Sequence, residues 1–177
     1  MTSAGDLLLA SPGLHDGIFD RAVIFLLDHS PEGSMGLVLN QPSELRVEEA
    51  LPALDLTDGR DLVYIGGPVE EGTALVLAEP ADPIATDLHY AREGIGLIDL
   101  ALPDPVQVIR ARVFSGYAGW GPRQLETELR SGAWISATAR DSDLWDVDTE
   151  DMWARIMARP ALIGDFLDAY PGQPWLN

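Results

Sequence analysis

The sequence predicts a single α/β domain with α+β character, in which helices flank a mixed β-sheet. Three observations lead to this fold class. The 177 residues, 46% of them apolar, suit one domain with a sizeable core. Segments with the pattern of strands outnumber those with the pattern of helices. Hairpin turns also occur beside helical segments, so the order does not alternate strictly as in a parallel sheet.

The first predicted strands include a hairpin. Leu7–Ala10 is a short apolar strand, and Arg21–Leu27 is a β-branched and aromatic run that suits a buried central strand. Six residues favoured in turns occupy Asp28–Gly33, and the apolar run Met35–Leu39 follows them. We therefore expect residues 21–27 and 35–39 to pair as an antiparallel hairpin.

The middle of the chain predicts one helix followed by strands. Ser43 suits a helix cap because apolar residues follow it at helical spacing: Val47, Ala50, Leu51 and Leu54. Pro52 would kink or shorten this helix. We expect Glu79–Glu93, with Pro80 and Pro83, to be a long surface loop. The expected strands are Leu62–Ile65, Thr73–Ala78 and Gly96–Leu100, with a turn at Gly66, Gly67 and Pro68.

The last third begins with a strand whose residues alternate between apolar and polar, Val106–Phe114. Ser115–Gly121 is predicted to be a glycine-rich loop. Pro122 suits the first turn of a helix, and Gly132 the position just past its end. The remaining predictions are a strand at Trp134–Ala137 and a helix capped by Asp148, with Met152, Trp153, Ile156 and Met157 facing the core.

Two absent amino acids exclude several classes of function. The chain has no cysteine, which excludes disulfides, thiolate nucleophiles, iron–sulfur clusters and cysteine-bearing zinc sites. It also has no lysine, so a P-loop, a pyridoxal Schiff base and the strand lysine of a protein kinase cannot be built. We therefore expect no cofactor.

The charge and hydropathy bear on partners and location. The formal net charge is -18, and the arginines are spread along the chain, so the field of the protein disfavours DNA and RNA as partners. Residues 1–20 contain no basic residue and no apolar run long enough for a signal peptide. No apolar stretch approaches the length of a membrane span, about 20 residues. The expected location is cytoplasmic.

Four segments carry a distinctive combination of residues. They read GDLLLASPGLHDGIFD at 5–20, HSPEGSMGLVLNQP at 29–42, YIGGPV at 64–69 and FSGYAGWGPRQLETELRSGAW at 114–134. Their order and spacing resemble the YqgE/AlgH family of bacterial proteins, over almost the whole chain. The resemblance implies a compact domain with a mixed sheet. It implies little chemistry, although one branch of the family is labelled a regulator of alginate production.

Two positions depart from the family pattern. A histidine is common in the family where the strand after GGPV ends, and this chain has Ala78 there. Arg123 occupies a position where the family motif often has glycine before Gln-Leu-Glu, and this arginine changes the charge at the expected helix start.

The candidate ligand-binding site is the loop and helix start at residues 115–124. Backbone amides at a helix start, with glycines that permit close approach and an arginine that adds charge, can bind an anion. Tyr117 and Trp120 could stack on a ring, and the neighbouring loops would complete the pocket. The alternative is that the glycines only shape the backbone and the aromatic residues only fill the core. The candidate residues are Ser115, Gly116, Tyr117, Gly119, Trp120, Gly121, Arg123, Gln124, Asn40, Gly66 and Gly67.

Other reactive residues indicate no site. His15, His29 and His89 lack metal-binding spacing, so no metal is expected. Glu70 and Glu71 point to opposite faces of a strand and suit solvent better than a cation. Two serines, Ser34 and Ser115, would need a neighbouring base to act as nucleophiles, and a sequence cannot reveal one.

Three functions remain open in a fixed order. The first is a module that binds a small molecule or an anion at the candidate site. The second is a regulatory or scaffold protein that acts through protein contacts, consistent with the family label. A hydrolase ranks last because no set of nucleophile, base and acid stands out, and no catalytic residue is predicted.

Overall fold

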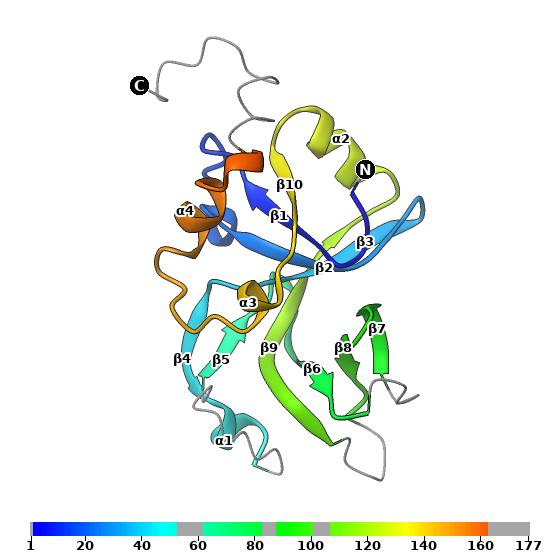
Figure 1. Cartoon of the computed structure of the whole chain (residues 1–177), viewed down its shortest axis with the longest axis vertical. Helices are drawn as coiled ribbons and strands as arrows, with labels where there is room; N and C mark the ends of the chain where they lie inside the picture. Colours follow the sequence, from blue (N-terminus) through cyan, green and yellow to red (C-terminus); the bar gives the residue numbers. More distant parts are fainter. Residues whose placement is uncertain (1, 53–61, 83–87, 101–106, 163–177) are drawn as a thin grey trace.

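The computed structural model of the chain describes residues 2–52, 62–82, 88–100 and 107–162. Within them, ten strands form one hydrogen-bonded sheet (Figure 1). The strands are β1 (Asp6–Ala10), β2 (Val23–Ser30), β3 (Gly33–Val38), β4 (Pro42–Arg46), β5 (Leu62–Ile65), β6 (Val69–Pro80), β7 (Leu88–Arg92), β8 (Ile95–Ile98), β9 (Val108–Trp120) and β10 (Trp134–Thr138). The helices are α1 (Val47–Ala50), α2 (Gln124–Arg130), α3 (Asp141–Leu144) and α4 (Met152–Met157), with a short 3-10 turn at Gly17–Phe19.

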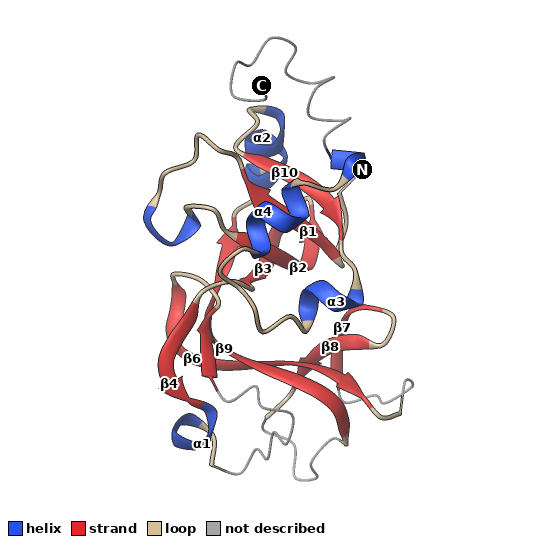
Figure 2. Cartoon of the chain, turned by 60° about the vertical axis from the view of Figure 1, so that its left-hand side comes forward, coloured by secondary structure: helices blue, strands red, loops and turns tan. Residues whose placement is uncertain are grey.

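The long strand β9 connects the two parts of the sheet. The strand order is β10-β1-β2-β3-β9-β6-β8-β7, and β5 pairs with both β4 and β9. Figure 2 shows β1, β2, β3 and β10 in the upper half of the molecule and β4, β6, β7 and β8 in the lower half. Neighbouring strands are antiparallel except for the parallel pair of β5 and β9. The predicted mixed sheet is therefore present, but the described helices have only four to seven residues and strands dominate the fold.

The sheet curves so far that strands distant in its order meet. β7, at one end of the order, contacts β2, and the amide of Gly5 beside β1 donates to the Leu26 carbonyl over 2.8 Å. The concave side encloses the largest core cluster, which includes Phe25, Leu37, Leu77 and Phe114. Because the core lies between both parts of the sheet, burial of this apolar surface couples them.

The segment from residue 139 to residue 162 closes the core. Leu144, Trp145, Met152 and Ile156 are buried in the main cluster, which confirms the predicted inward face of the last helix. Trp153 packs against this cluster and donates its indole N–H to the Ala10 carbonyl over 2.9 Å. The closing segment is therefore an integral part of the core.

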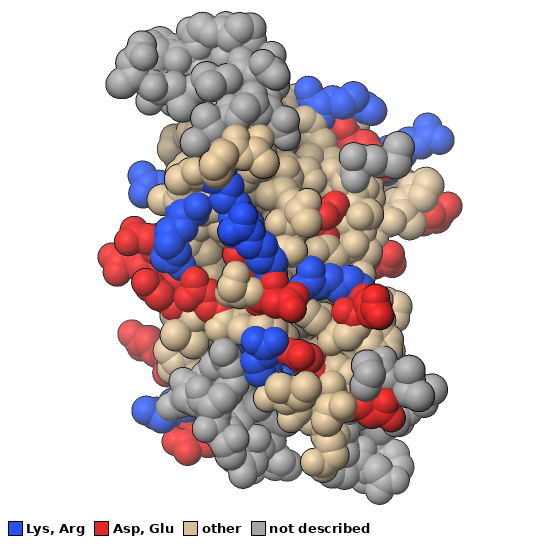
Figure 3. All heavy atoms as spheres, viewed as in Figure 1, with Lys and Arg blue, Asp and Glu red and all other residues tan. Residues whose placement is uncertain are grey.

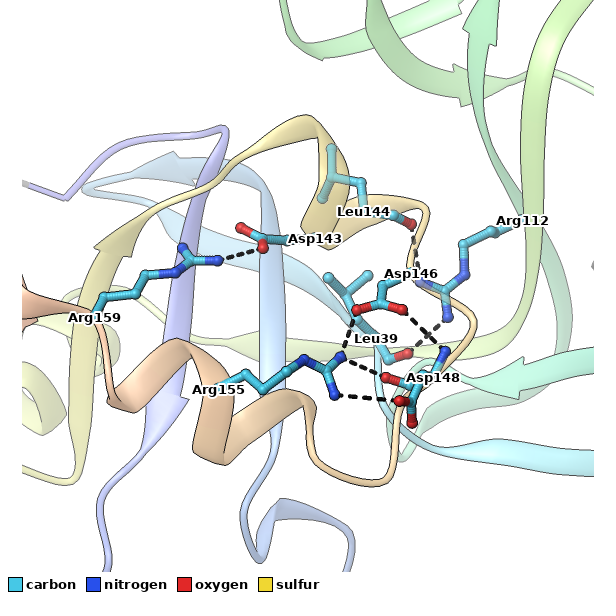
Figure 4. A network of polar contacts seen from close by, with 8 residues as sticks. All are labelled: Leu39, Arg112, Asp143, Leu144, Asp146, Asp148, Arg155 and Arg159. Carbon is cyan, nitrogen blue, oxygen red and sulfur yellow. Dashed lines mark hydrogen bonds and ion pairs between the residues drawn. The ribbon is translucent and has the colours of Figure 1, made fainter.

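Arginines fasten the closing segment to the sheet and to itself (Figure 4). Arg112 of β9 is 1% exposed and donates to the carbonyls of Leu144, at 2.9 Å, and Leu39, at 2.8 Å. Arg155 pairs with Asp146 and Asp148, and the neighbouring Arg159 with Asp143. On the face seen in Figure 3, arginines lie next to carboxylates and do not form a separate basic patch.

The helix expected after Ser43 is wrong over most of its length. Residues Pro42–Arg46 form strand β4, and the hydroxyl of Ser43 donates to the Val63 carbonyl over 2.7 Å. The pairing of β4 with β5 thus outweighs the helical spacing, and only one helical turn, Val47–Ala50, forms before Pro52. Leu54 lies outside the described residues.

Three segments expected to be turns or loops contribute to strands. The six-residue turn at Asp28–Gly33 is shorter than predicted, because β2 extends to Ser30 and β3 begins at Gly33. The loop expected at Glu79–Glu93 contains β7, which pairs with β8. Pro83 in that loop lies outside the described residues. The glycine-rich loop expected after Phe114 continues β9 as far as Trp120.

The other strands agree with the predictions to within a few residues. The strand expected at 106–114 is the first part of β9, and the one expected at 73–78 lies within β6. The last helix begins at Met152, after the predicted cap Asp148, and α3 was not predicted. No helix in the described ranges has the length and apolar character needed to cross a membrane.

Candidate functional site

Most of the predicted site segment, residues 115–124, is sheet, so its expected loop geometry is wrong. Gly119 and Trp120 pair with Met35 and Ser34 of β3. The amide of Gly121 donates to the side-chain oxygen of Gln124 over 3.0 Å. The polar groups near the start of α2 are therefore engaged within the protein, and the anion cradle predicted there loses its structural basis.

Trp120 belongs to the core. Its side chain is 7% exposed, and its indole N–H donates to Glu128 over 2.9 Å. Trp134, 5% exposed, donates to the same carboxylate oxygen over 2.8 Å, and the two indole rings meet edge to face with centroids 5.9 Å apart. This arrangement leaves the Trp120 ring no free face of the kind that base stacking requires, in agreement with the structural alternative.

Three more predicted residues shape the backbone. The side-chain oxygen of Asn40 accepts from the Val23 amide, and its amide group donates to the Arg21 carbonyl, both over 2.9 Å. A side chain on Gly66 would meet the Gly116 carbonyl oxygen at 2.2 Å, and one on Gly67 would meet the β9 backbone at 2.1 Å. Only glycine permits this close approach of the turn to β9.

The other predicted residues lie around the end of β9 without forming a common pocket. The Ser115 hydroxyl donates to the Glu71 carbonyl. Gly116 has φ of 68° and faces the turn at Gly67. Arg123 is exposed, and Gln124 donates to Glu128 over 2.8 Å.

A hollow of about 490 Å³ lies between the β2–β3 hairpin and the second half of β9. We call it the hairpin hollow. It brings together three of the predicted residues, Tyr117, Gly119 and Trp120. The remaining lining residues are Asp28, Ser30, Glu32, Gly33, Ser34, Met35 and Val69.

The sheet register builds the hairpin hollow from neighbouring strands. Met35 pairs with Asp28 on one side and with Gly119 on the other, while Val69 of β6 pairs with Tyr117. A side chain added at Gly119 would touch the Tyr117 ring at 3.4 Å and Val69 at 3.6 Å. Gly119 therefore forms part of the floor, and the missing side chain leaves room for a guest.

Free polar groups line the hairpin hollow. The carboxylates of Asp28 and Glu32 are exposed, and neither forms an ion pair or hydrogen bond with a described residue. The hydroxyl of the half-buried Tyr117 also has no partner among the described residues. Because all these groups project from paired strands, they are available without rearrangement of the backbone.

One histidine lies near the hairpin hollow. The ring Nδ1 of His29 is 2.7 Å from the hydroxyl oxygen of Ser34, its cross-strand neighbour. His15 lies 3.4 Å from Asp20 at the surface. The described residues contain no group of three histidine or acidic side chains placed to bind a metal ion.

The sequence analysis missed the hairpin side of the hollow because Asp28–Gly33 was interpreted as a turn. The available signal was the polar character of residues directly after the buried run Arg21–Leu27. Such residues suit a turn equally well, and only the pairing of β3 with β9 brings them next to Tyr117.

Arg123 occupies a backbone conformation that favours glycine, with φ of 58° and ψ of 9°. We expect Arg123→Gly to raise the free energy of unfolding by about 1 kcal/mol, because the left-handed region costs residues with a side chain about 1–2 kcal/mol. The same replacement at Arg130, inside α2, should lower it by about 0.5–1 kcal/mol. Urea unfolding of both variants measures the two changes. A stability loss in Arg123→Gly would contradict the assignment of strain.

Comparison with known proteins places this arrangement in a family. The chain is 40% identical over 183 residues to a UPF0301 protein of Streptomyces avermitilis, covering 98% of this chain and 94% of that one. It is 35% identical over 191 residues to a UPF0301 protein of Thermobifida fusca, covering 100% and 96%.

Two solved structures share the fold. A crystal structure of a protein from Corynebacterium diphtheriae superposes with a TM-score of 0.81 at 26% identity, covering 92% of this chain and 91% of that one. The solution structure of AlgH from Pseudomonas aeruginosa superposes with a TM-score of 0.70 at 28% identity, covering 96% and 95%. The AlgH-like family profile matches residues 7–162. The chain therefore belongs to the AlgH-like family, as the four sequence segments predicted.

Proposed function

We propose that this protein binds a small molecule in the hairpin hollow. The observation that carries the proposal is that a cavity with an empty floor at Gly119 lies beside free polar groups of Asp28, Glu32 and Tyr117. Its volume falls within the range of ligand pockets, about 300–1,000 Å³. Apolar contact surface from Met35 and Val69 complements the polar groups.

Binding explains the lining better than hydrolysis does. Ser34 and His29 form the only serine–histidine hydrogen bond among the described residues, so Ser34 has a neighbouring base. Side chains of successive strand residues point to opposite faces, so Ser34 faces away from the side occupied by Met35. Met35 and Tyr117 pack on one core cluster, whereas Trp120, opposite Ser34, belongs to another. The Ser34–His29 pair thus belongs to the other face of the sheet.

A matched pair of glycine variants tests the proposal. Gly119→Leu should place its side chain between Tyr117 and Val69 and fill the floor. A side chain at the exposed Gly13 would meet no atom within 4 Å, so Gly13→Leu serves as the control.

We expect a library of metabolites, screened by thermal shift, to contain a compound that stabilises the wild type and Gly13→Leu. The affinity of this compound for Gly119→Leu should fall at least about tenfold, a loss of about 1.4 kcal/mol in binding. Equal affinity for Gly119→Leu would place the ligand elsewhere. A screen without any stabilising compound would favour the alternative, a scaffold protein that acts through protein contacts.

A further inference from the structure

The charge of the hairpin hollow specifies the chemistry of its guest. Asp28 and Glu32 are its only charged lining residues, and no arginine lines it. Both carboxylates lack partners among the described residues. A second anion would meet two like charges without compensation, whereas a cation would gain two partners. This inference rests on the proposed function and narrows the class of ligand.

The carboxylates and the aromatic ring come from different sides of the hollow. Asp28 lies near the end of β2, and Glu32 occupies the two-residue connection to β3. Tyr117 lies on β9, beyond the intervening strand β3. A guest in the hollow would therefore have acidic groups on the hairpin side and a ring on the β9 side.

Tyr117 and Met35 favour an organic cation with apolar substituents. The face of a tyrosine ring attracts ammonium groups electrostatically, and a thioether offers a soft, polarizable contact. Val69 adds an apolar surface next to Tyr117. A strongly hydrated metal ion would gain nothing from these three side chains, and it requires more oxygen ligands than two carboxylates supply.

The rest of the protein reinforces this preference. The net charge of -18 produces a potential that attracts cations over long range. Two further acidic residues, Glu70 and Glu71, directly follow Val69 in β6, and both are exposed. The local and global fields therefore act in the same direction.

We propose that the ligand of the hairpin hollow is a small organic cation of the ammonium class. Its positive group lies between the carboxylates of Asp28 and Glu32 and the ring of Tyr117. Its apolar substituents contact Met35, Val69 and the floor at Gly119.

Choline and its neutral isostere 3,3-dimethylbutan-1-ol provide a direct probe, because they share a shape and differ in charge. We expect choline to perturb amide resonances of residues 28–35 and 117–119 in NMR titrations, and the alcohol to bind about tenfold more weakly or not at all. Asp28→Asn combined with Glu32→Gln should weaken choline binding about tenfold, and Glu93→Gln, an exposed acid outside the hollow, should not. Tyr117→Phe should retain binding, while Tyr117→Leu should lose it.

The outcomes separate the two proposals. Equal binding of choline and the alcohol, or unchanged choline binding in the double variant, would overturn the ammonium assignment. The hollow would still be a binding site if Gly119→Leu abolished that binding. Choline binding that survives Gly119→Leu would overturn the proposed function itself. Saturable binding of a short arginine-rich peptide, without binding of choline or propylammonium, would identify a protein segment as the occupant and contradict a small-molecule ligand.

Discussion

Replacing Arg112 by methionine is expected to lower the free energy of unfolding by about 2–4 kcal/mol, because two buried carbonyl groups lose their donor. The guanidinium group joins the carbonyls of Leu39 and Leu144. Its central carbon also lies 4.0 Å from the centre of the Tyr64 ring, which adds a desolvated cation–π contact. Methionine retains the apolar volume but replaces none of these contacts. Urea unfolding followed by far-UV circular dichroism measures the change.

Arg110 provides the matched control on the same strand. It lies two residues earlier, is partly exposed and donates to Glu79 over 2.7 Å. Because exposed ion pairs contribute only about 0–1 kcal/mol, Arg110→Met should remain close to the wild type. If both variants lost the same stability, the buried contacts of Arg112 would not be responsible.

Replacing Glu128 by alanine should also cost about 2–4 kcal/mol, because two buried indole N–H groups lose one shared acceptor. Trp120 and Trp134 both donate to the same oxygen of Glu128. Glu128→Gln retains an acceptor without the negative charge and should recover part of the loss. Thermal unfolding, with near-UV circular dichroism of the tryptophans, measures both variants.

A second glutamate of α2 distinguishes this network from helix propensity. Glu126 forms no hydrogen bond or ion pair with a described residue. Glu126→Ala should therefore change the stability by less than about 0.5 kcal/mol. A comparable loss in Glu126→Ala would show that α2 responds to any substitution, and it would remove the special role of the two indoles.

Local patterns predicted the buried strands and one helix well, and they failed where pairing partners decide the structure. Arg21–Leu27 and Trp134–Ala137 were found because their composition suits a buried strand. The strand at Pro42–Arg46 was not, since its residues form a strand only beside β5. Its helical spacing was genuine, but the single turn at Val47–Ala50 is all that tertiary contacts allow.

The candidate site was predicted in part, for a physical reason that also explains the error. The glycines after Phe114 favour a loop when the sequence is considered alone. In the fold, Gly116 instead lets β9 pass close to the turn at Gly67, and Gly119 leaves space beside Tyr117. The aromatic and glycine residues were therefore identified, while the acidic partners Asp28 and Glu32 required knowledge of the strand order.

The position of β1 between β2 and β10 determines when this protein can finish folding in the cell. The first strand to leave the ribosome requires an outer neighbour made from residues 134–138, and Ala10 accepts a bond from Trp153, 143 positions later. A nascent chain therefore exposes part of its apolar core until the last quarter of the sequence has been synthesised. Folding is completed only near the end of translation, and during that interval the growing chain is a natural substrate for chaperones.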